Sequence, residues 1–327
     1  MAFLRAIAAF LCVLPVAGCG WIEQAKEKID EALDAEHGVL FYAYDTLARP
    51  GEPVDLVARV QKSKNTLGLG GVTVAFYNGK ELLGQAVTAE DGRARISWTP
   101  QEAGDYHFTA RPVALPGDID GDYKDLLKVT PAPLLVTART GDARFVVIDL
   151  DGTVVGGSFK KVLSGDPKPI ADSVKVTRKI AQQYSIVYLT HRPDLLMRKS
   201  KLWLGEHDFP PGPLLVSNLK EAFGDSGRFK TAKLAEMRKE FPNVEIGIGD
   251  KLSDAQAYAD NGLTAYLMPN YKPNPWEMRK LANEIRALRW QERLQVVSGW
   301  SEVEAGILAG AKYPPEEFAR RLEARAN

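Results

Sequence analysis

The sequence contains only two cysteines among its 327 residues, and both lie close to the amino terminus. Cys12 lies inside an apolar run, and Cys19 follows that run. The remainder of the chain therefore has no cysteine for a disulfide. Folding must depend on burial of apolar side chains, and the length is sufficient for two compact domains.

The sequence also lacks an excess of either charge. Lys and Arg total 42 and Asp and Glu total 42, so the formal net charge is zero. Nucleic-acid binding requires a basic surface, so we expect no nucleic-acid partner. A local basic pocket for one phosphate remains compatible with this balance.

No apolar run is long enough to span a bilayer, which takes about 20 residues. The run Ala6–Leu14 follows Arg5 and precedes the small residues Ala17 and Gly18. A positive start, a short apolar stretch and a small-residue site are the order of a secretory signal peptide. Residues 1–18 are therefore predicted to be a signal that is removed from the mature chain.

The segment Val16-Ala17-Gly18-Cys19 resembles the lipobox of bacterial lipoproteins. This resemblance implies a lipidated Cys19 that anchors the exported chain to a membrane, and Gly20 favours the outer membrane, facing the periplasm. The alternative is a plain secretory signal with an incidental cysteine. Residues 19–36 are predicted to form a lipidated helical stalk.

Residues 37–141 are predicted to form a small all-β sandwich. Short segments rich in β-forming residues recur about every ten residues and are separated by turns such as Asn78-Gly79. This spacing is typical of a β-sandwich. The predicted strands are Val54–Val60, Val72–Tyr77, Leu82–Thr88, Ala94–Thr99 and Tyr106–Ala110.

The stretches Glu90–Pro100 and Ala103–Ala110 resemble bacterial immunoglobulin-like modules, and this resemblance implies that Tyr106 is a corner tyrosine. Such a module positions its neighbour, so we assign it no chemistry. The segment Asp118-Ile-Asp-Gly-Asp122 is either a solvated loop or a Ca²⁺ loop, although it lacks the downstream glutamate of an EF-hand.

From Arg144 the pattern changes to continuous apolar strands that alternate with helices. This alternation predicts a doubly wound parallel sheet over residues 142–272. Residues 273–327 are predicted to be a helical extension, with its tryptophans packed against the sheet. The strands are Phe145–Leu150, Ser185–Thr190, Pro213–Val216, Val244–Ile248 and Thr264–Leu267, and the helices are Ile170–Gln183, Asp194–His207, Lys230–Phe241 and Ser253–Asn261.

Two carboxylates follow the first of these strands, in the sequence Asp149-Leu-Asp151-Gly152-Thr153. Open parallel sheets bind their ligands beyond the carboxyl ends of the strands. Two aspartates at such a position repel each other and lose solvation unless a cation is present. Mg²⁺ prefers carboxylate oxygens, so the motif predicts a magnesium site.

Further polar residues occupy corresponding places along the sheet. Thr190 ends the second strand, Lys230 lies at the start of a helix, and Asp250 and Asp254 follow another strand. Each of these residues alone is a weak signal. Because parallel strands end at one edge, their combination predicts a single site.

Residues 144–268 resemble the haloacid-dehalogenase-like phosphatases. Within that superfamily they are most similar to the lipin-type phosphatidate phosphatases and the related domain of phosphatidylinositol-transfer proteins. The lipin-like proteins usually have alanine at the position of His191 and asparagine at the position of Asp250. The resemblance is carried by Asp149–Thr153, Tyr188–Pro193, Trp203-Leu204, Pro211–Val216, Phe229-Lys230 and Gly247–Tyr258.

The resemblance implies a role for each motif residue. Asp149 would attack phosphorus and form an aspartyl-phosphate, while Asp151 would act as general acid and then as general base. Thr190 and Lys230 would hold the phosphoryl oxygens. Mg²⁺ would be held by Asp149, the backbone carbonyl of Asp151, and Asp250, with Asp254 orienting a metal-bound water or Lys230.

Gly152, Thr153, His191 and Arg192 complete the expected site as substrate-binding residues. For Arg192 the sequence leaves two interpretations open, a second cation for the substrate and an ordinary surface arginine.

The segments between the motifs are too short for an inserted cap domain, so the site is expected to be open. An open site and a lipid anchor favour a phospholipid substrate such as phosphatidate. One alternative is a phosphatidate-binding module without turnover. Another is a scavenging phosphatase for soluble phosphomonoesters.

Overall fold

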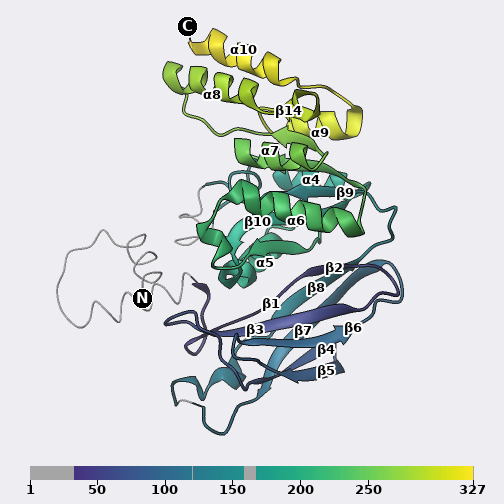
Figure 1. Cartoon of the computed structure of the whole chain (residues 1–327), viewed down its shortest axis with the longest axis vertical. Coiled ribbons are helices and arrows are strands. Elements are labelled where there is room, and N and C mark those ends of the chain that lie inside the picture. Colours follow the sequence, from purple (N-terminus) through teal and green to yellow (C-terminus); the bar gives the residue numbers. More distant parts are fainter. Residues whose placement is uncertain (1–32, 120, 158–166, 327) are drawn as a thin grey trace, which may run out of the picture. The chain divides into compact units, whose positions relative to one another are not determined.

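The computed structural model describes residues 33–119, 121–157 and 167–326 (Figure 1). The predicted signal peptide, Cys19 and most of the predicted stalk lie outside these ranges. The described residues form two compact units. The first, here called the sandwich unit, extends to Arg139 and includes Asp194–Leu202; the second, the α/β unit, comprises the remaining residues from Thr140 onward.

The sandwich unit is built from two sheets. The smaller has the order β1-β3-β6 and is antiparallel, and the larger has the order β2-β8-β7-β4-β5, with β2 and β8 parallel. The strands are β1 (Val39–Ala43), β2 (Thr46–Ala48), β3 (Val54–Lys62), β4 (Thr73–Asn78), β5 (Glu81–Val87), β6 (Arg93–Trp98), β7 (Gly104–Ala114) and β8 (Ala132–Ala138). Short 3₁₀ turns cover Gly121–Tyr123, Leu126–Lys128 and Asp194–Leu196.

Inward-facing side chains of both sheets share one apolar core. Leu56 and Val60 of β3 pack in the same cluster as Phe76 of β4 and Phe108 of β7. The Tyr106 hydroxyl donates a hydrogen bond of 2.9 Å to the carbonyl of Glu102, the kind of bond that a tyrosine corner makes. The immunoglobulin-like assignment itself remains a prediction.

The α/β unit contains one six-stranded sheet of order β11-β10-β9-β12-β13-β14, in which every pairing is parallel. A parallel sheet needs cover on both faces, which is why β9 is apolar at each position. The strands are β9 (Phe145–Ile148), β10 (Ser185–Pro193), β11 (Leu214–Ser217), β12 (Val244–Gly249), β13 (Thr264–Leu267) and β14 (Leu294–Val296).

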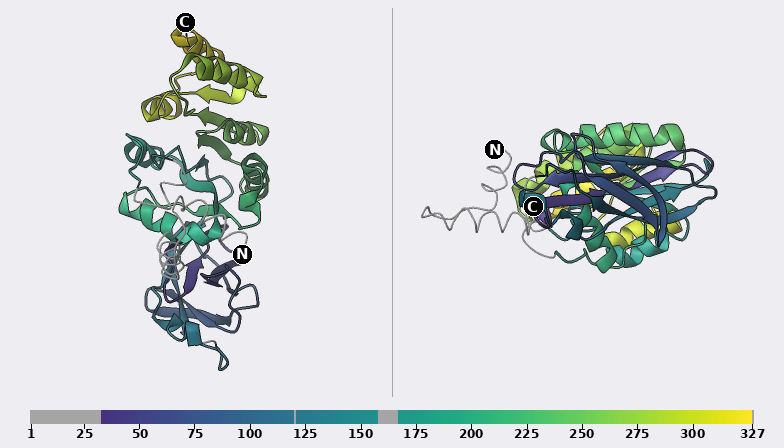
Figure 2. Two further views of the ribbon diagram at one scale, coloured as in Figure 1. Left: turned by 90° about the vertical axis from the view of Figure 1, so that its left-hand side faces the viewer. Right: turned by 90° about the horizontal axis from the view of Figure 1, so that it is seen from below.

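Helices lie on both sides of this sheet (Figure 2). The helix α6 packs against α7 and β10, while α4 packs against α9 and α8 packs against α10. These helices are α4 (Ser173–Ile180), α6 (Ser226–Glu240), α7 (Leu252–Asp260), α8 (Pro275–Ala287), α9 (Trp300–Ala309) and α10 (Pro315–Ala326), with 3₁₀ turns at Glu221–Phe223 and Gln291–Arg293. The helix α5 (Met197–Glu206) begins within the residues of the sandwich unit.

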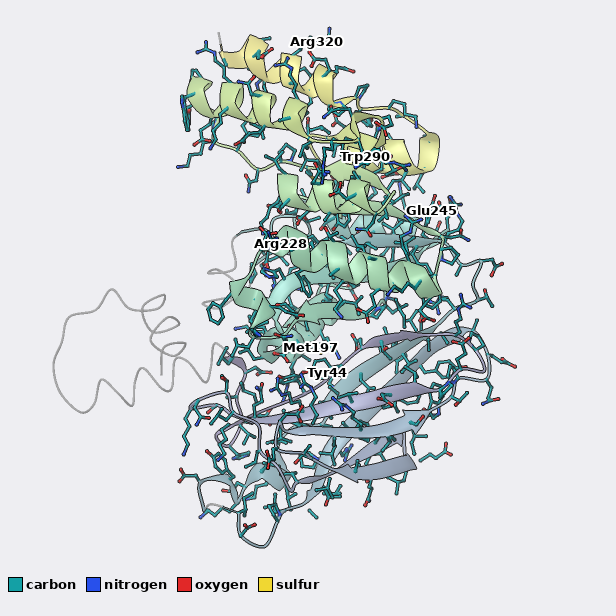
Figure 3. The ribbon with its side chains drawn as sticks, viewed as in Figure 1. Tyr44, Met197, Arg228, Glu245, Trp290 and Arg320 are labelled. Atoms are coloured by element: carbon teal, nitrogen blue, oxygen red, sulfur yellow. The ribbon has the colours of Figure 1, made fainter. Side chains whose placement is uncertain are left out.

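The carboxyl-terminal extension differs from the expected helical segment in two respects. It contributes β14, which pairs with β13 and makes the sheet one strand wider than predicted. Of its three tryptophans, Trp300 is buried, but Trp276 is 66% exposed and Trp290, labelled in Figure 3, is 51% exposed. The prediction that all three are packing residues is therefore wrong for Trp276 and Trp290.

Candidate active site

The carboxyl ends of three neighbouring strands bring the predicted residues together. Asp149 directly follows β9, Thr190 lies near the end of β10, and Asp250 directly follows β12. The strand β9 lies between the other two, and all three run in one direction. Lys230 lies in the second turn of α6 rather than at its first residue, and Asp254 lies in the first turn of α7.

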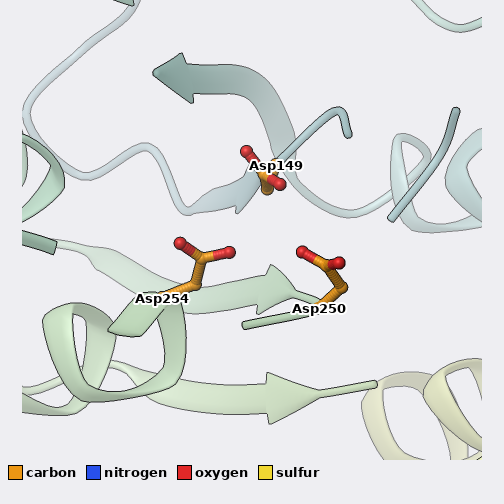
Figure 4. A group of neighbouring side chains, drawn as sticks. All are labelled: Asp149, Asp250 and Asp254. Carbon is orange, nitrogen blue, oxygen red and sulfur yellow. The ribbon is translucent and has the colours of Figure 1, made fainter. Parts of the chain in front are cut away.

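Three carboxylates, here called the acidic group, converge at this edge of the sheet. Asp149, Asp250 and Asp254 each offer an oxygen within 4.8 Å of the others, and Figure 4 shows the carboxylates directed toward one another. One buried oxygen of each carboxylate has no hydrogen-bond partner among the described residues. Such atoms are costly to bury unpaired, and an all-oxygen set suits a hard divalent cation. The residues present therefore fit Mg²⁺.

One buried ammonium lies beside the acidic group. Lys230 Nζ is 2.7 Å from Oδ1 of Asp149 and 2.7 Å from Oδ1 of Asp254. Burial disfavours the charged form of Lys230, but the two carboxylates outweigh burial and hold its pKa above the ordinary value. Lys230 thus stays positive and leaves the second oxygen of Asp149 unoccupied.

The single ammonium does not balance three acids. Burial raises the pKa of Asp149 to about 6; Lys230 opposes this rise, and the neighbouring carboxylates add to it. Burial, together with the charges of Asp149 and Asp254, raises the pKa of Asp250 to about 7. Excess negative charge in a buried place is the environment in which a bound cation lowers the free energy most.

The second carboxylate of the motif has a different partner. Arg192 Nη2 lies 2.7 Å from Asp151 Oδ1, and Arg192 Nε lies 2.9 Å from Asp151 Oδ2. The Arg192 side chain is 2% exposed and that of Asp151 is 17% exposed. The interpretation of Arg192 as a surface arginine is therefore wrong. The side chain of Asp151 is not part of the acidic group.

A cavity of about 220 Å³ opens beside these residues. The sequence pointed to five of its lining residues but missed Pro193, Ala222 and Lys251. Lys251 directly follows Asp250, and a positively charged residue next to a motif aspartate could have indicated that Lys251 belongs to the site. The lining residues are Asp149, Asp151, Thr190, His191, Arg192, Pro193, Ala222 and Lys251.

Gly152 and Thr153 do not line this cavity, although we expected them to contact substrate. Gly152 has φ +79°, and a Cβ at this position would lie 2.1 Å from Oδ2 of Asp250. Thr153 is fully buried, and its carbonyl accepts a 2.9 Å hydrogen bond from Nε1 of Trp300. Both residues therefore shape the loop after β9.

Ser217, at the end of β11, is a polar residue that the sequence analysis missed. Its hydroxyl lies 3.0 Å from the carbonyls of both His191 and Arg192. His191 also has its Nε2 atom 2.9 Å from the carbonyl of Glu221. These bonds fix the segment between Thr190 and Pro193, and no spacing in the sequence could indicate them.

The family-model comparison matches a segment of the α/β unit. Residues 146–267 match the family model described as PITM 1-3, LNS2 domain. Human membrane-associated phosphatidylinositol transfer protein 1 is 30% identical over 222 residues, which cover 67% of this chain and 16% of that protein. Human membrane-associated phosphatidylinositol transfer protein 2 is 27% identical over 196 residues, which cover 58% of this chain and 13% of that protein.

These alignments thus cover less than one fifth of the length of each relative. Among solved structures, a haloacid dehalogenase-like family hydrolase from Xanthomonas campestris aligns with a TM-score of 0.36 and 14% identity. This alignment covers 57% of this chain and 99% of that chain. Over the described part of the chain, no helix combines the length and apolar character needed to cross a membrane.

Proposed function

We propose that this chain hydrolyses phosphomonoesters with Mg²⁺, through an aspartyl-phosphate on Asp149, and that its substrate is a phospholipid such as phosphatidate. One observation carries the proposal. Asp149 lines a cavity together with Asp151 and Thr190, and Lys230 engages only one of its two oxygens. A nucleophile and a proton-transfer group therefore line the space where a phosphoryl group would bind, and a buried cation contacts the nucleophile.

The proposed reaction has two steps. In the first, a carboxylate oxygen of Asp149 bonds to phosphorus, the ester P–O bond breaks, and the leaving oxygen takes a proton from Asp151. In the second, Asp151 takes a proton from a water molecule, the water oxygen bonds to phosphorus, and the P–O bond to Asp149 breaks. Phosphate leaves, and both aspartates return to their starting states.

Charge neutralisation accompanies both steps. Lys230 and Thr190 would hold phosphoryl oxygens, and Lys230 offsets the charge of Asp149. Mg²⁺ would be held by Asp149, Asp250 and the backbone carbonyl of Asp151, with Asp254 beside it. When bound, it supplies Lewis-acid stabilisation of the negative charge on the phosphoryl group.

Two observations support a lipid substrate. The relatives of the matched segment carry the name phosphatidylinositol transfer protein, which points to phospholipid binding. In addition, the described residues between β9 and β10 contain one α-helix, α4, so the described part of that connection adds no second domain over the cavity.

A second candidate function is phospholipid binding without turnover. The names of the relatives favour it, since they describe transfer rather than hydrolysis. Against it, the candidate nucleophile Asp149 and Asp151 line one cavity, and Lys230 contacts Asp149.

The deciding experiment compares phosphate release from phosphatidate vesicles and from soluble esters, including nucleotides and glycerol 3-phosphate, with Mg²⁺ or with EDTA. We expect Mg²⁺-dependent release, fastest from the vesicles, and none from the Asp149→Asn variant. Faster release from soluble esters would favour a scavenging phosphatase. Vesicle binding without release from any ester would favour the binding function.

We further propose that Cys19 carries the lipid anchor and that the protein is held at the outer membrane, facing the periplasm. The support is the segment Val16–Cys19 at the end of an apolar run. Expression of the full chain and of its Cys19→Ala variant, followed by membrane fractionation, tests this proposal. The parent should be recovered with outer membranes; recovery in the soluble fraction would contradict the anchor.

A further inference from the structure

The two aspartates of the motif after β9 are held by different cations. Asp149 belongs to the acidic group and contacts Lys230, whereas both oxygens of Asp151 contact the guanidinium of Arg192. Two parallel hydrogen bonds from one guanidinium fix the plane of a carboxylate as well as its position. The orientation of the Asp151 carboxylate is therefore fixed, although its side chain lines a cavity.

Arg192 is itself well anchored. Its backbone N–H donates to Oγ1 of Thr190 at 3.3 Å, and its carbonyl lies 3.0 Å from the hydroxyl of Ser217. The side chain is almost fully buried. A chain of contacts thus runs from β11 through Arg192 to the carboxylate of Asp151.

The separation of the two aspartates has a chemical reason. A hard cation accepts any carboxylate within reach, and Asp151 lies two residues from Asp149. A carboxylate bound to the cation cannot also carry a proton to and from the reacting oxygen. The two hydrogen bonds from Arg192 keep the oxygens of Asp151 on the cavity side, where a leaving oxygen or a water molecule would be.

We propose that Arg192 is a positioning residue, which holds the carboxylate of Asp151 beside the phosphoryl site and apart from the acidic group. This inference rests on the proposed function, because it assigns proton transfer to Asp151. It differs from the expectation that Arg192 binds the substrate phosphate, and the two roles predict different kinetics.

The test is a double-mutant cycle of wild type, Arg192→Gln, Asp151→Asn and the double variant. Two esters are compared in the presence of Mg²⁺. One is 4-nitrophenyl phosphate, whose leaving group needs no proton, and the other is the alkyl ester that the wild type hydrolyses fastest. The quantity compared is kcat/KM, which reports the step that cleaves the ester bond.

Loss of a general acid lowers the rate by about 10²–10⁴-fold, so Asp151→Asn should show that loss with the alkyl ester. Arg192→Gln should lower kcat/KM about 10–100-fold with the alkyl ester and severalfold or less with 4-nitrophenyl phosphate. In the Asp151→Asn background, Arg192→Gln should cause no further loss. A crystal structure of Arg192→Gln should show the Asp151 carboxylate displaced from the cavity wall.

Several results would overturn the inference. Equal losses with both esters, or multiplicative losses in the cycle, would mean that Arg192 binds phosphate directly. A crystal structure of Arg192→Gln in which the Asp151 carboxylate has not moved would also contradict the positioning role. If Arg192→Gln does not fold, Arg192→Lys takes its place, because a lysine keeps the positive charge but cannot make the two parallel hydrogen bonds. Arg192→Lys should show the same difference between the two esters. Parent-like kinetics of Arg192→Lys would refute the positioning role.

The same experiment distinguishes a failure of the proposed function from a failure of this inference. A wild-type chain that releases phosphate from no ester overturns that function and this inference with it. An active wild-type chain that gives any of the contrary results above overturns the inference alone.

Discussion

The pattern Asp-x-Asp-Gly occurs twice in this chain, starting at Asp118 and at Asp149. The first copy belongs to the sandwich unit, where Asp118 is exposed and the nearby Asp122 has a side chain 71% exposed. The second follows a buried strand of the α/β unit, where Asp149 is fully buried. The same residue types therefore meet very different solvation.

This difference separates a polar loop from a candidate reaction site. An exposed carboxylate is stabilised by water and needs no partner. A buried carboxylate must be neutralised, and the neighbours that neutralise Asp149 are Lys230 and, as we propose, a divalent cation. The burial of the motif at the end of a strand, rather than the motif itself, determines which copy forms a candidate reaction site.

The largest expected effect concerns the first aspartate of each copy. We expect Asp149→Asn to lower phosphate release on the order of 10⁴-fold or more, because the covalent route needs its carboxylate. Asp118→Asn is the matched control and should retain parent activity. Initial rates of Mg²⁺-dependent phosphate release measure both variants. Comparable rates for all three proteins would remove Asp149 from the reaction.

The second effect concerns the lysine beside each acidic segment. In EDTA, Lys230→Met should lower the unfolding free energy of the α/β unit by about 3–5 kcal/mol, since two buried carboxylates lose their ammonium. Lys64 lies 3.6 Å from the exposed Asp122, so Lys64→Met should cost the sandwich unit about 0–1 kcal/mol. Urea unfolding followed by probes in each unit gives both values. Equal costs would show that burial does not distinguish the two pairs.

The third effect is stabilisation by the metal. Mg²⁺ at about 100 times its dissociation constant should stabilise the α/β unit by about 2.7 kcal/mol, because a ligand that binds the folded state raises stability by mass action. Asp250→Asn should remove most of this gain, and Asp122→Asn should keep it. Thermal unfolding with Mg²⁺ or EDTA provides the measurement. An Mg²⁺-induced shift of the sandwich transition instead would move the metal site to the exposed copy.

The smallest effect concerns the glycine at the fourth position of each copy. Gly152→Ala should destabilise the α/β unit by about 1–3 kcal/mol, because Gly152 has a positive φ and its new Cβ would contact Asp250. Among the described residues, and apart from its chain neighbours, no atom lies within 4 Å of a Cβ built on Gly121, so Gly121→Ala should change stability by less than about 0.5 kcal/mol. Denaturant midpoints of the two variants are compared with the parent. A neutral Gly152→Ala would mean that the loop after β9 rearranges freely.

Much of the strand pattern could be predicted from the sequence because each strand has a simple solvent environment. In β3 and β7 buried residues alternate with more exposed ones, and β9 is a continuous apolar run. The strands β1, β2 and β8 were not predicted. All five residues of β1 are buried, so that strand shows no alternation. The strand β14 has three residues, too few for any periodicity.

The candidate site was predictable where it depends on strand ends and not where it depends on side-chain partners. The carboxyl ends of parallel strands meet at one edge, so Asp149, Thr190 and Asp250 could be grouped from order alone. The pairing of Arg192 with Asp151 depends on burial and on the hydroxyl of Ser217, the last residue of β11, which donates a hydrogen bond to the carbonyl of Arg192. Such contacts arise only when the tertiary structure is formed.

The added strand β14 has a practical consequence for anyone who isolates the α/β unit. The match to the family model ends at residue 267, yet β14 covers the outer edge of β13, and Nε1 of Trp300 donates a hydrogen bond to the carbonyl of Thr153 in the motif loop. A fragment trimmed at the limit of similarity would expose the backbone of β13 to pairing with other molecules. Such a fragment is expected to aggregate, and inactivity measured on it would say nothing about the chemistry of the intact protein.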